Sequence, residues 1–358
     1  MTKPPQKHPR RTVTLRDVAR ETGVSISTVS IVLNQSRLSK NLSVQTRIRV
    51  EEAARRLGYT PDPVARSLKN RHSQTVGVMI FDITDPYCTR LLKGIEGALV
   101  KTQFLPLIMS VQNKADIFHR YWKLLHERRI EGLIIVPNWA TLSAEKVIEG
   151  LQQVPCVVIG SAHSRDHMSC ITIDNAGGGT KALAHLYELG HRAIAVLRGP
   201  ENILASRLRW RGIQKFSKDA GLHLDPAICM EMRALPDASS TFEEGYRLTS
   251  ELLSTQHPFT ALLAFDDLAA AGAIRAFHDL GRSVPRDCSV IGFDDIPHAQ
   301  LISPSLTTMR QPLEQMGAMS VETLLMHIQA KDEGKIHKAV SQMLEVELLV
   351  RRSTTPRE

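Results

Sequence analysis

The stretch TLRDVARETGVSISTVSIVLN, from Thr14 to Asn34, decides the fold of the amino-terminal region. Thr14 and Asp17 have the spacing of a capping box, in which each of two side chains bonds to a free backbone N–H at the start of a helix. Gly23 can adopt the left-handed conformation that a tight turn after a helix requires, and Ser25 can cap a second helix. The stretch therefore predicts two short helices joined by a tight turn.

A third helix is predicted between Ser43, which can cap its start, and Gly58, which can end it. The intervals between Ala19, Gly23 and Val29 fit two helices that cross closely, which is typical of a helix-turn-helix unit. The apolar residues expected in a shared core are Val18, Ala19, Val29, Val32, Leu33, Ile48, Ala53 and Leu57. Three short helices around one small core are therefore expected here.

The second helix is expected to present small hydroxyl and apolar side chains to the major groove of DNA. Hydroxyl groups suit phosphate and base-edge contacts, and an isoleucine such as Ile26 or Ile31 can pack on a thymine methyl group. The alternative places both isoleucines in the core. The residues predicted to contact DNA from the three helices are Thr14, Leu15, Ser25, Ile26, Ser27, Thr28, Ser30, Ile31, Asn34 and Thr46.

Positive charge is concentrated in the same region. Residues 1–74 contain 15 of the 45 Lys and Arg side chains but only 5 of the 37 Asp and Glu side chains, a balance of +10 in a chain whose net charge is +8. A local excess of cations suits a polyanion, because each phosphate that is neutralised releases condensed counterions. A basic segment can also be a solvated linker, so charge alone does not decide between the two.

From Thr75 onward, short apolar runs alternate with helical patterns, as in a parallel α/β sheet. One series of predicted strands covers residues 76–81, 105–110, 132–137, 154–160 and 171–174, and a second covers 193–198, 227–232, 261–265 and 290–293. Two similar halves are implied. Ligands of such sheets bind beyond the carboxyl ends of the strands, which selects Asp82, Asp85, Asn138, Asp174, Asp267, Asp294 and Asp295.

Several function classes find no support in the sequence. No apolar run approaches the roughly 18 residues of a membrane span, and Met1 to Arg11 lacks the apolar core of a secretory signal, so a cytoplasmic protein is expected. The five cysteines are scattered singly, which favours buried, reduced thiols. Gly177 to Lys181 lacks the ending of a phosphate-binding loop, and the adjacent Asp294 and Asp295 are expected to point apart. Neither a metal, a cofactor nor an enzyme activity is predicted.

Longer motifs resemble the lactose-repressor (LacI/GalR) family of transcriptional regulators. They comprise Thr14 to Ala19, Ser25 to Asn34, Thr46 to Val50 and Leu57 to Leu68, then Arg207 to Gly212, Phe265 to Gly272 and Val290 to Pro312, which together span nearly the whole chain. The resemblance implies an α/β protein with an amino-terminal three-helix helix-turn-helix domain and a bilobal, periplasmic-binding-protein-like domain with two parallel-sheet lobes. The expected divisions are a basic arm 1–12, the helix-turn-helix domain 13–60, a hinge helix and linker 61–74, the bilobal effector-binding and dimerisation domain 75–340, and a terminal strand and tail 341–358.

The resemblance also implies roles for residues outside the three helices. A short hinge helix would order on operator DNA, with Leu68 of each subunit wedged into the minor groove. Its DNA-contacting residues are Ala65, Arg66, Leu68 and Lys69. In the cleft between the lobes, Arg209 and Asp267 match a charged clamp for a polar effector, although an interlobe ion pair would also fit them. The predicted effector-binding residues are Asp82, Asp85, Tyr87, Asn138, Trp139, Arg209, Asp267, Phe293 and Asp294.

The expected protein is a homodimeric repressor that binds double-stranded operator DNA and a small effector, a sugar or related metabolite, with no membrane partner and no heptad run for a tetramer. Ile31 stands where the family usually has a base-reading arginine, and the chain is longer than its relatives between Asn34 and Ser43, so an unusual operator is expected. Inducer and corepressor are both open. One rival is a solute-binding protein for transport, against which the helix-turn-helix region argues. The other is a sugar-converting enzyme, for which no arranged acid and base is found.

Overall fold

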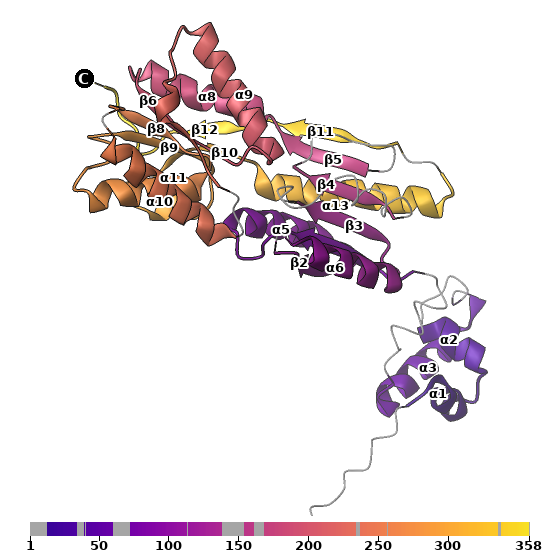
Figure 1. Ribbon diagram of the computed structural model, residues 1–358. Coiled ribbons are helices and arrows are strands. Elements are labelled where there is room, and N and C mark those ends of the chain that lie inside the picture. The colour runs from indigo at the N-terminus through magenta and orange to yellow at the C-terminus, as the bar shows by residue number, and fades with distance from the viewer. Residues whose placement is uncertain are drawn as a thin grey trace, which may run out of the picture. The chain divides into compact units, whose positions relative to one another are not determined.

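The computed structural model describes residues 13–33, 39, 41–59, 72–112, 114–137, 154–160, 168–233, 237–255, 257–335 and 338–357. The chain divides into two compact units, Met1–Ser73 and Gln74–Glu358 (Figure 1). The predicted basic arm 1–12 lies outside the described residues. So do further predicted site residues, namely Asn34, Ala65, Arg66, Leu68, Lys69, Asn138 and Trp139.

The described residues of the first unit form three short helices: α1 (Leu15–Thr22), α2 (Ile26–Leu33) and α3 (Val44–Leu57). The predicted capping box is present at the start of α1, where the N–H of Thr14 donates to a carboxylate oxygen of Asp17 at 2.9 Å. Gly23 follows α1 with a φ of 69°, and Gly58 follows α3 with a φ of 69°. Both glycines thus adopt the left-handed conformation, and the helix ends that the sequence predicts are confirmed.

The core of the first unit lies between its three helices. Its buried apolar residues are Val18, Ala19, Val29, Val32, Val50, Ala53 and Ala54, with Leu33 and Leu57 packed against them. The prediction that Ile48 joins this core is wrong, because its side chain is 48% exposed. Val50, about 200° further around the helix, faces inward instead.

The second unit contains two lobes, each built on a six-stranded sheet. In the first lobe the strand order is β11-β5-β4-β3-β1-β2, and every neighbouring pair is parallel. The strands are β1 (Thr75–Ile80), β2 (Leu105–Ser110), β3 (Gly132–Val136), β4 (Cys156–Ile159), β5 (Met168–Ile173) and β11 (Ser341–Leu344). The helices of this lobe are α5 (Pro86–Leu99), α6 (Ala115–Glu127) and α13 (Leu313–Asp332) (Figure 1).

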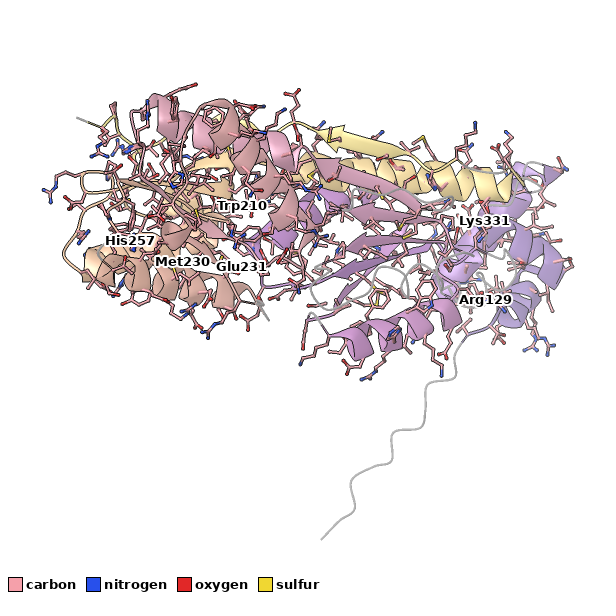
Figure 2. The ribbon with its side chains drawn as sticks, turned by 45° about the horizontal axis from the view of Figure 1, so that its top comes forward. Arg129, Trp210, Met230, Glu231, His257 and Lys331 are labelled. Atoms are coloured by element: carbon pink, nitrogen blue, oxygen red, sulfur yellow. The ribbon has the colours of Figure 1, made fainter. Side chains whose placement is uncertain are left out.

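The second lobe repeats this plan. Its strand order is β12-β10-β9-β8-β6-β7, parallel throughout except for β12. The strands are β6 (Ile194–Arg198), β7 (Cys229–Glu231), β8 (Ala261–Leu263), β9 (Ser289–Asp294), β10 (Thr307–Arg310) and β12 (Glu347–Leu349). The helices are α8 (Asn175–Glu188), α9 (Leu204–Asp219), α10 (Ala238–Ser254), α11 (Asp267–Asp279) and the short α12 (His298–Leu301). Figure 2 labels Trp210 and Glu231 on this lobe and Lys331 on the first. The predicted fold class, two parallel-sheet lobes behind a helix-turn-helix unit, is confirmed.

The chain crosses between the lobes where β5 leads into α8, where β10 leads into α13, and where β11 leads into β12. The prediction of a single terminal strand is therefore wrong, because the last apolar run contributes one strand to each sheet. The residues that follow are not a free tail. Ser353 is fully buried, and its hydroxyl donates to the carbonyl oxygen of Val290 at 2.6 Å. Residues 341–357 thus belong to the two lobes.

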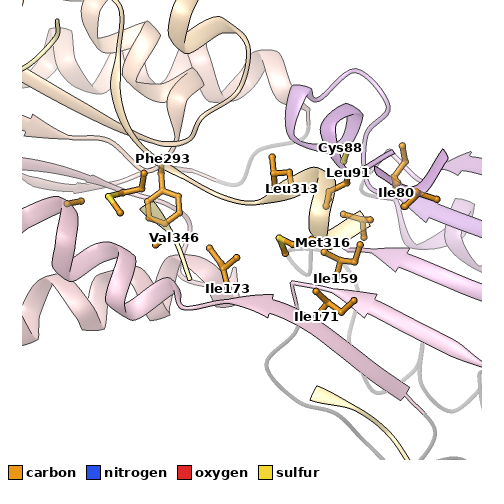
Figure 3. Close-up of a cluster of buried hydrophobic side chains, with 14 of the residues drawn as sticks. Ile80, Cys88, Leu91, Ile159, Ile171, Ile173, Phe293, Leu313, Met316 and Val346 are labelled. Carbon is orange, nitrogen blue, oxygen red and sulfur yellow. The ribbon is translucent and has the colours of Figure 1, made fainter. Parts of the chain in front are cut away.

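A continuous apolar core runs from one lobe into the other, and Figure 3 shows Phe293 of β9 beside Val346, which lies between the last two strands. Helices α8 and α9 cross closely beside this core. At Gly178 a Cβ would lie 2.7 Å from the ring of Phe293, and at Gly212 a Cβ would lie 1.9 Å from the carbonyl oxygen of Ala176. The glycines that open α8 therefore serve close packing, and they are not a phosphate-binding loop.

Candidate functional site

A cavity lies between the two lobes, at the carboxyl ends of their central strands. It encloses about 1050 Å³, including the part that is open to solvent. Its walls are formed by Phe81, Asp85, Tyr87, Pro137, Ile159, Gly160, Ile173, Asn175, Ile203, Leu204, Ala205, Arg209, Asp237, Thr241, Phe265, Asp266, Leu268, Asp294, Ile296, Gln311 and Met316. Residues at or just beyond β1, β3, β4 and β5 of one lobe and β8 and β9 of the other line it, as expected for a ligand site in parallel sheets.

Arg209 on α9 is a buried cation in the wall of this cavity, with 8% of its surface exposed. Its Nε donates to Oδ1 of Asn175 at 3.0 Å, and its Nη1 donates to the carbonyl oxygen of Phe265 at 2.6 Å. Its Nη2 lies 3.5 Å from Oδ1 of Asp294. The guanidinium carbon also stands 3.6 Å from the centroid of the Phe293 ring, which it covers. Arg209 therefore contacts groups from three other segments of the chain.

The two adjacent carboxylates at the end of β9 point to different partners, as the sequence predicts. Asp294 faces the cavity and accepts a hydrogen bond from Nε2 of Gln311. Asp295 faces away, held by Nε of Arg310 at 2.9 Å and by the guanidinium of Arg351. The backbone turns sharply between them, with φ of 115° at Asp294 and 57° at Asp295. Such angles strain residues other than glycine, and this strain is typical of functional sites.

The predicted clamp of Arg209 and Asp267 is wrong in its second member. Asp267 is 1% exposed and does not line the cavity. Its two oxygens accept from Oγ1 of Thr308 at 2.5 Å and from the N–H of Ile296 at 2.9 Å, because the first residue of α11 points inward against the sheet. The preceding Asp266 lines the cavity instead and caps α11, accepting from the N–H of Ala269 at 2.7 Å.

Of the remaining predicted effector residues, Asp85 and Tyr87 line the cavity at the start of α5. Asp85 caps this helix by accepting from the N–H of Tyr87 at 2.8 Å. Asp82 is 7% exposed and bonds to the N–H and the hydroxyl of Thr84, so it shapes the turn and is not a wall residue. Phe293 is 1% exposed and lies behind Arg209, which rules out a stacking face for a ligand.

Three carboxyl groups of the cavity have strongly raised pKa values. Burial raises the pKa of Asp85, Asp266 and Asp294 to about 7. Repulsion adds to burial, because Asp294 raises the pKa of Asp266, and Asp266 raises that of Asp85. The guanidinium of Arg209 lowers the pKa of Asp294, but this effect is smaller than that of burial. The three groups cannot all ionise cheaply at neutral pH, so the cavity carries less negative charge than three ionised carboxylates would give it.

The polar and aromatic members of this site that sequence reasoning missed include Asn175, Phe265, Asp266 and Gln311. Asn175 opens α8 and Gln311 follows β10, so both stand where the chain crosses between the lobes. Only Asp266 had a local signal, because an aspartate directly before a helix is a strong cap. Asn175 and Gln311 reach the site through these crossings, and Phe265 through the fold of the second lobe.

The outward side of α2 and its cap carry several of the residues predicted to read DNA. Oγ of Ser25 accepts from the N–H of Thr28 at 3.0 Å, and both Ser25 and Ser27 are exposed. Ile26 is 45% exposed, so it is not a core residue, and Ile31 is half-buried. The outward position predicted for Ser30 is wrong. Ser30 is 6% exposed, because it follows Val29 on the side of α2 that faces the core.

The other predicted DNA contacts in the first unit stand at helix starts. Thr14 is exposed before α1, whereas Leu15 is partly buried against the core. Thr46 is half-buried in the first turn of α3, where its N–H donates to Oγ of Ser43 at 3.2 Å. Helix starts carry partial positive charge, so Thr14 and Thr46 stand where phosphates are favoured.

The structure also bears on metals, thiols and membranes. Within the described ranges, no group of three or more His, Cys, Asp or Glu side chains is arranged to hold a metal ion. All five cysteines are free, and Cys229 alone among them is not buried. No helix in the described part of the chain has both the length and the apolar character to cross a membrane.

Each of the two units is similar to a known protein family. Residues 14–62 match the family of bacterial regulatory proteins described as the lacI family, and residues 183–354 match a periplasmic binding protein-like domain. The HTH-type transcriptional repressor PurR of Serratia proteamaculans (strain 568) is 32% identical over 343 residues, which cover 95% of this chain and 96% of that protein.

Two solved structures are similar over the same extent. The lac repressor dimer bound to operator and the anti-inducer ONPF is 29% identical, with a TM-score of 0.81 over 96% of this chain and 100% of the other. The complex of the transcriptional regulator CelR with cellobiose is 28% identical, with a TM-score of 0.69 over 95% of this chain and 99% of the other.

Proposed function

The chain belongs to the LacI family of bacterial transcription regulators, and we propose on that premise that it is a homodimeric repressor whose operator affinity is set by a small polar effector in the cleft. The observation that carries this proposal is the presence, in one chain, of a helix-turn-helix unit and a bilobal unit with a cavity between its lobes. The operator bound by the lac repressor dimer and the cellobiose bound by CelR support the two kinds of ligand. Action on the chromosome implies a cytoplasmic location.

The DNA-reading surface is proposed to be the outward side of α2 with the two helix starts beside it. Ser25, Ser27 and Thr28 supply hydroxyl groups for phosphates and base edges, and Ile26 supplies apolar surface for a thymine methyl group. Ile31 replaces a longer, charged reader at its position, so the preferred operator differs from the common family half-site. Thr14 and Thr46 are assigned to the phosphate backbone, and Leu68 to the minor groove.

The effector is proposed to bind across the cleft, where it touches both lobes at once. Asp85 and Tyr87 belong to the first lobe, whereas Arg209, Asp266 and Asp294 belong to the second. A ligand held by both sides favours the closed arrangement of the lobes, and its differential affinity for that state is what shifts the equilibrium. The buried Asp267 and Phe293 support this site from behind.

A second copy of the chain is proposed to cover the edge of the first sheet. Strand β2 stands at that edge, and its Leu105, Leu107 and Ile108 are 70%, 41% and 46% exposed. An apolar edge strand left open invites uncontrolled pairing, so proteins cover such edges. The dimer of the lac repressor supports a two-fold assembly, which matches a near-palindromic operator.

This function is tested by selecting duplexes from a random pool with the full chain and measuring binding by fluorescence anisotropy. We expect enrichment of a near-palindromic motif, bound about a thousandfold more tightly than random DNA at physiological salt. The motif should lack the base that an arginine at position 31 would read. Selection without a motif, with affinity that depends on salt alone, would contradict a sequence-specific regulator.

A further inference from the structure

The cleft contains more negative charge than its own cation can balance. Four carboxyl groups, those of Asp85, Asp237, Asp266 and Asp294, line the cavity, and Arg209 is the only Lys or Arg among the described lining residues. Asp237 is exposed and bonded to Ser239 and Ser240, so solvent screens it. The other three are partly or fully buried, and burial raises the pKa of each to about 7.

Arg209 is already paired with acceptors of the chain itself. Its guanidinium already faces three acceptors of the chain itself, on Asn175, Phe265 and Asp294, at 2.6 to 3.5 Å. The face of the guanidinium lies on the ring of Phe293 at 3.6 Å. The charge of Arg209 is therefore largely neutralised within the second lobe, and these contacts engage three of its five N–H groups.

The helix starts that border the cavity offer no anion site either. Asp85 caps α5 and Asp266 caps α11, so each carboxylate already occupies a backbone N–H that an anion would need. Asp85 accepts from the N–H of Tyr87, and Asp266 accepts from the N–H groups of Ala269 and Leu268. Each group thus retains acceptor capacity, because an ionised carboxylate has about four lone-pair sites. The cleft is rich in acceptors and poor in free donors.

We propose, building on the effector role of the cleft proposed above, that the effector carries a basic nitrogen and binds as a cation. Asp85 of the first lobe and Asp266 of the second are its counter-ions. The positive charge of the ligand takes the place of the protons on these two carboxyl groups, and it attracts both lobes. Tyr87 and Phe265 also line the cavity and complete the site, because the face of an aromatic ring attracts a cation. Sugar phosphates and sugar acids are excluded by repulsion.

Proton release should accompany binding of such a ligand. The titratable and charged groups that face the cluster are Asp82, Asp85, Tyr87 and Cys88 from the first lobe and Arg209, Asp266, Asp267 and Asp294 from the second. Burial and mutual repulsion keep the pKa of Asp85 and Asp266 near 7 in the free protein. A bound cation favours the ionised carboxylates and lowers these pKa values, so affinity rises with pH up to about 7 and levels off above it.

The test uses the full chain and ligand sets that differ only in charge. Each set holds a 6-amino-6-deoxyhexose, the parent hexose and the matching uronate, in the gluco, galacto and manno series, with 5′-amino-5′-deoxyadenosine, adenosine and adenosine 5′-carboxylate as a fourth set. Thermal shift selects the set that binds, and calorimetry at pH 5.5 and 8 measures it. We expect the amine to bind about tenfold more tightly than its neutral parent at pH 8, with loss of most of that advantage at pH 5.5.

Variants separate this inference from the function on which it rests. Asp85→Asn and Asp266→Asn should each remove the preference for the amine and its pH dependence, whereas Asp279→Asn, an exposed carboxylate paired with Arg275 on α11, should change neither. Equal or tighter binding of a neutral or anionic member would overturn the cationic effector alone. Failure of every compound to shift the thermal transition would instead contradict the effector role of the cleft.

Discussion

Replacing Arg209 by alanine is expected to abolish the effect of the effector on operator binding, with effector affinity reduced about a hundredfold and operator affinity kept within about threefold. The reason is positional. The guanidinium holds Asn175, Phe265 and Asp294 in place, and each of these lines the cavity. Truncation leaves buried acceptors unpaired. It also removes the cation that faces Asp294, which is the only Lys or Arg among the described lining residues.

The effect is measured by effector titration in calorimetry and by operator titration in anisotropy, with thermal unfolding to show that the variant folds. Arg211→Ala is the matched control, because Arg211 is exposed on the same helix and does not line the cavity. It should leave both titrations unchanged. An Arg209→Ala variant that keeps the effector affinity of the parent would remove Arg209 from the site.

Replacing Val29 by aspartate is expected to abolish specific operator binding. Val29 is fully buried in the small core between α1, α2 and α3. An unpaired carboxylate there costs several kcal/mol, which is a large share of the stability of a unit of this size. The first unit should unfold at ambient temperature while the second keeps its effector binding, because the two units form separate compact bodies.

Anisotropy measures the loss of operator affinity, and calorimetry with the effector checks the second unit. Val29→Ala serves as the graded control. It leaves no buried charge and should retain measurable specific binding. Operator binding by Val29→Asp at the level of the parent chain would show that α2 is not held by this core.

Local signals predicted the ends of helices well and the phase of α2 poorly. Capping residues and left-handed glycines act within a few residues, so Thr14, Asp17 and Gly23 determine the start and end of α1 directly. By contrast, α2 carries apolar residues around much of its surface. Val29 and Val32 are buried, yet Ile26 is exposed and the polar Ser30 is buried. A helix with so weak a polar stripe does not reveal which side faces the core.

The position of the cleft could be predicted from the sequence, but the contacts between its residues could not. Strand ends pointed to Asp85 and Asp294, because ligands of parallel sheets bind there. The contacts of Arg209 come from residues 175, 265 and 294, which are distant in sequence and meet in the folded second lobe, where only residue 175 follows a crossing between the lobes. The same crossings divide the last apolar run into β11 and β12, which lie in different sheets. The pattern of apolar residues along the sequence does not show which sheet each strand joins.

The central claim is that a ligand bound in the cleft changes the affinity of the first unit for operator DNA. The direct measurement is fluorescence anisotropy of the selected operator duplex, titrated with the full chain in the absence and in the saturating presence of the compound that stabilises it in thermal shift. We predict that operator affinity changes about 5- to 150-fold between the two titrations, in one direction or the other. Superimposable titration curves at saturating ligand would contradict the account.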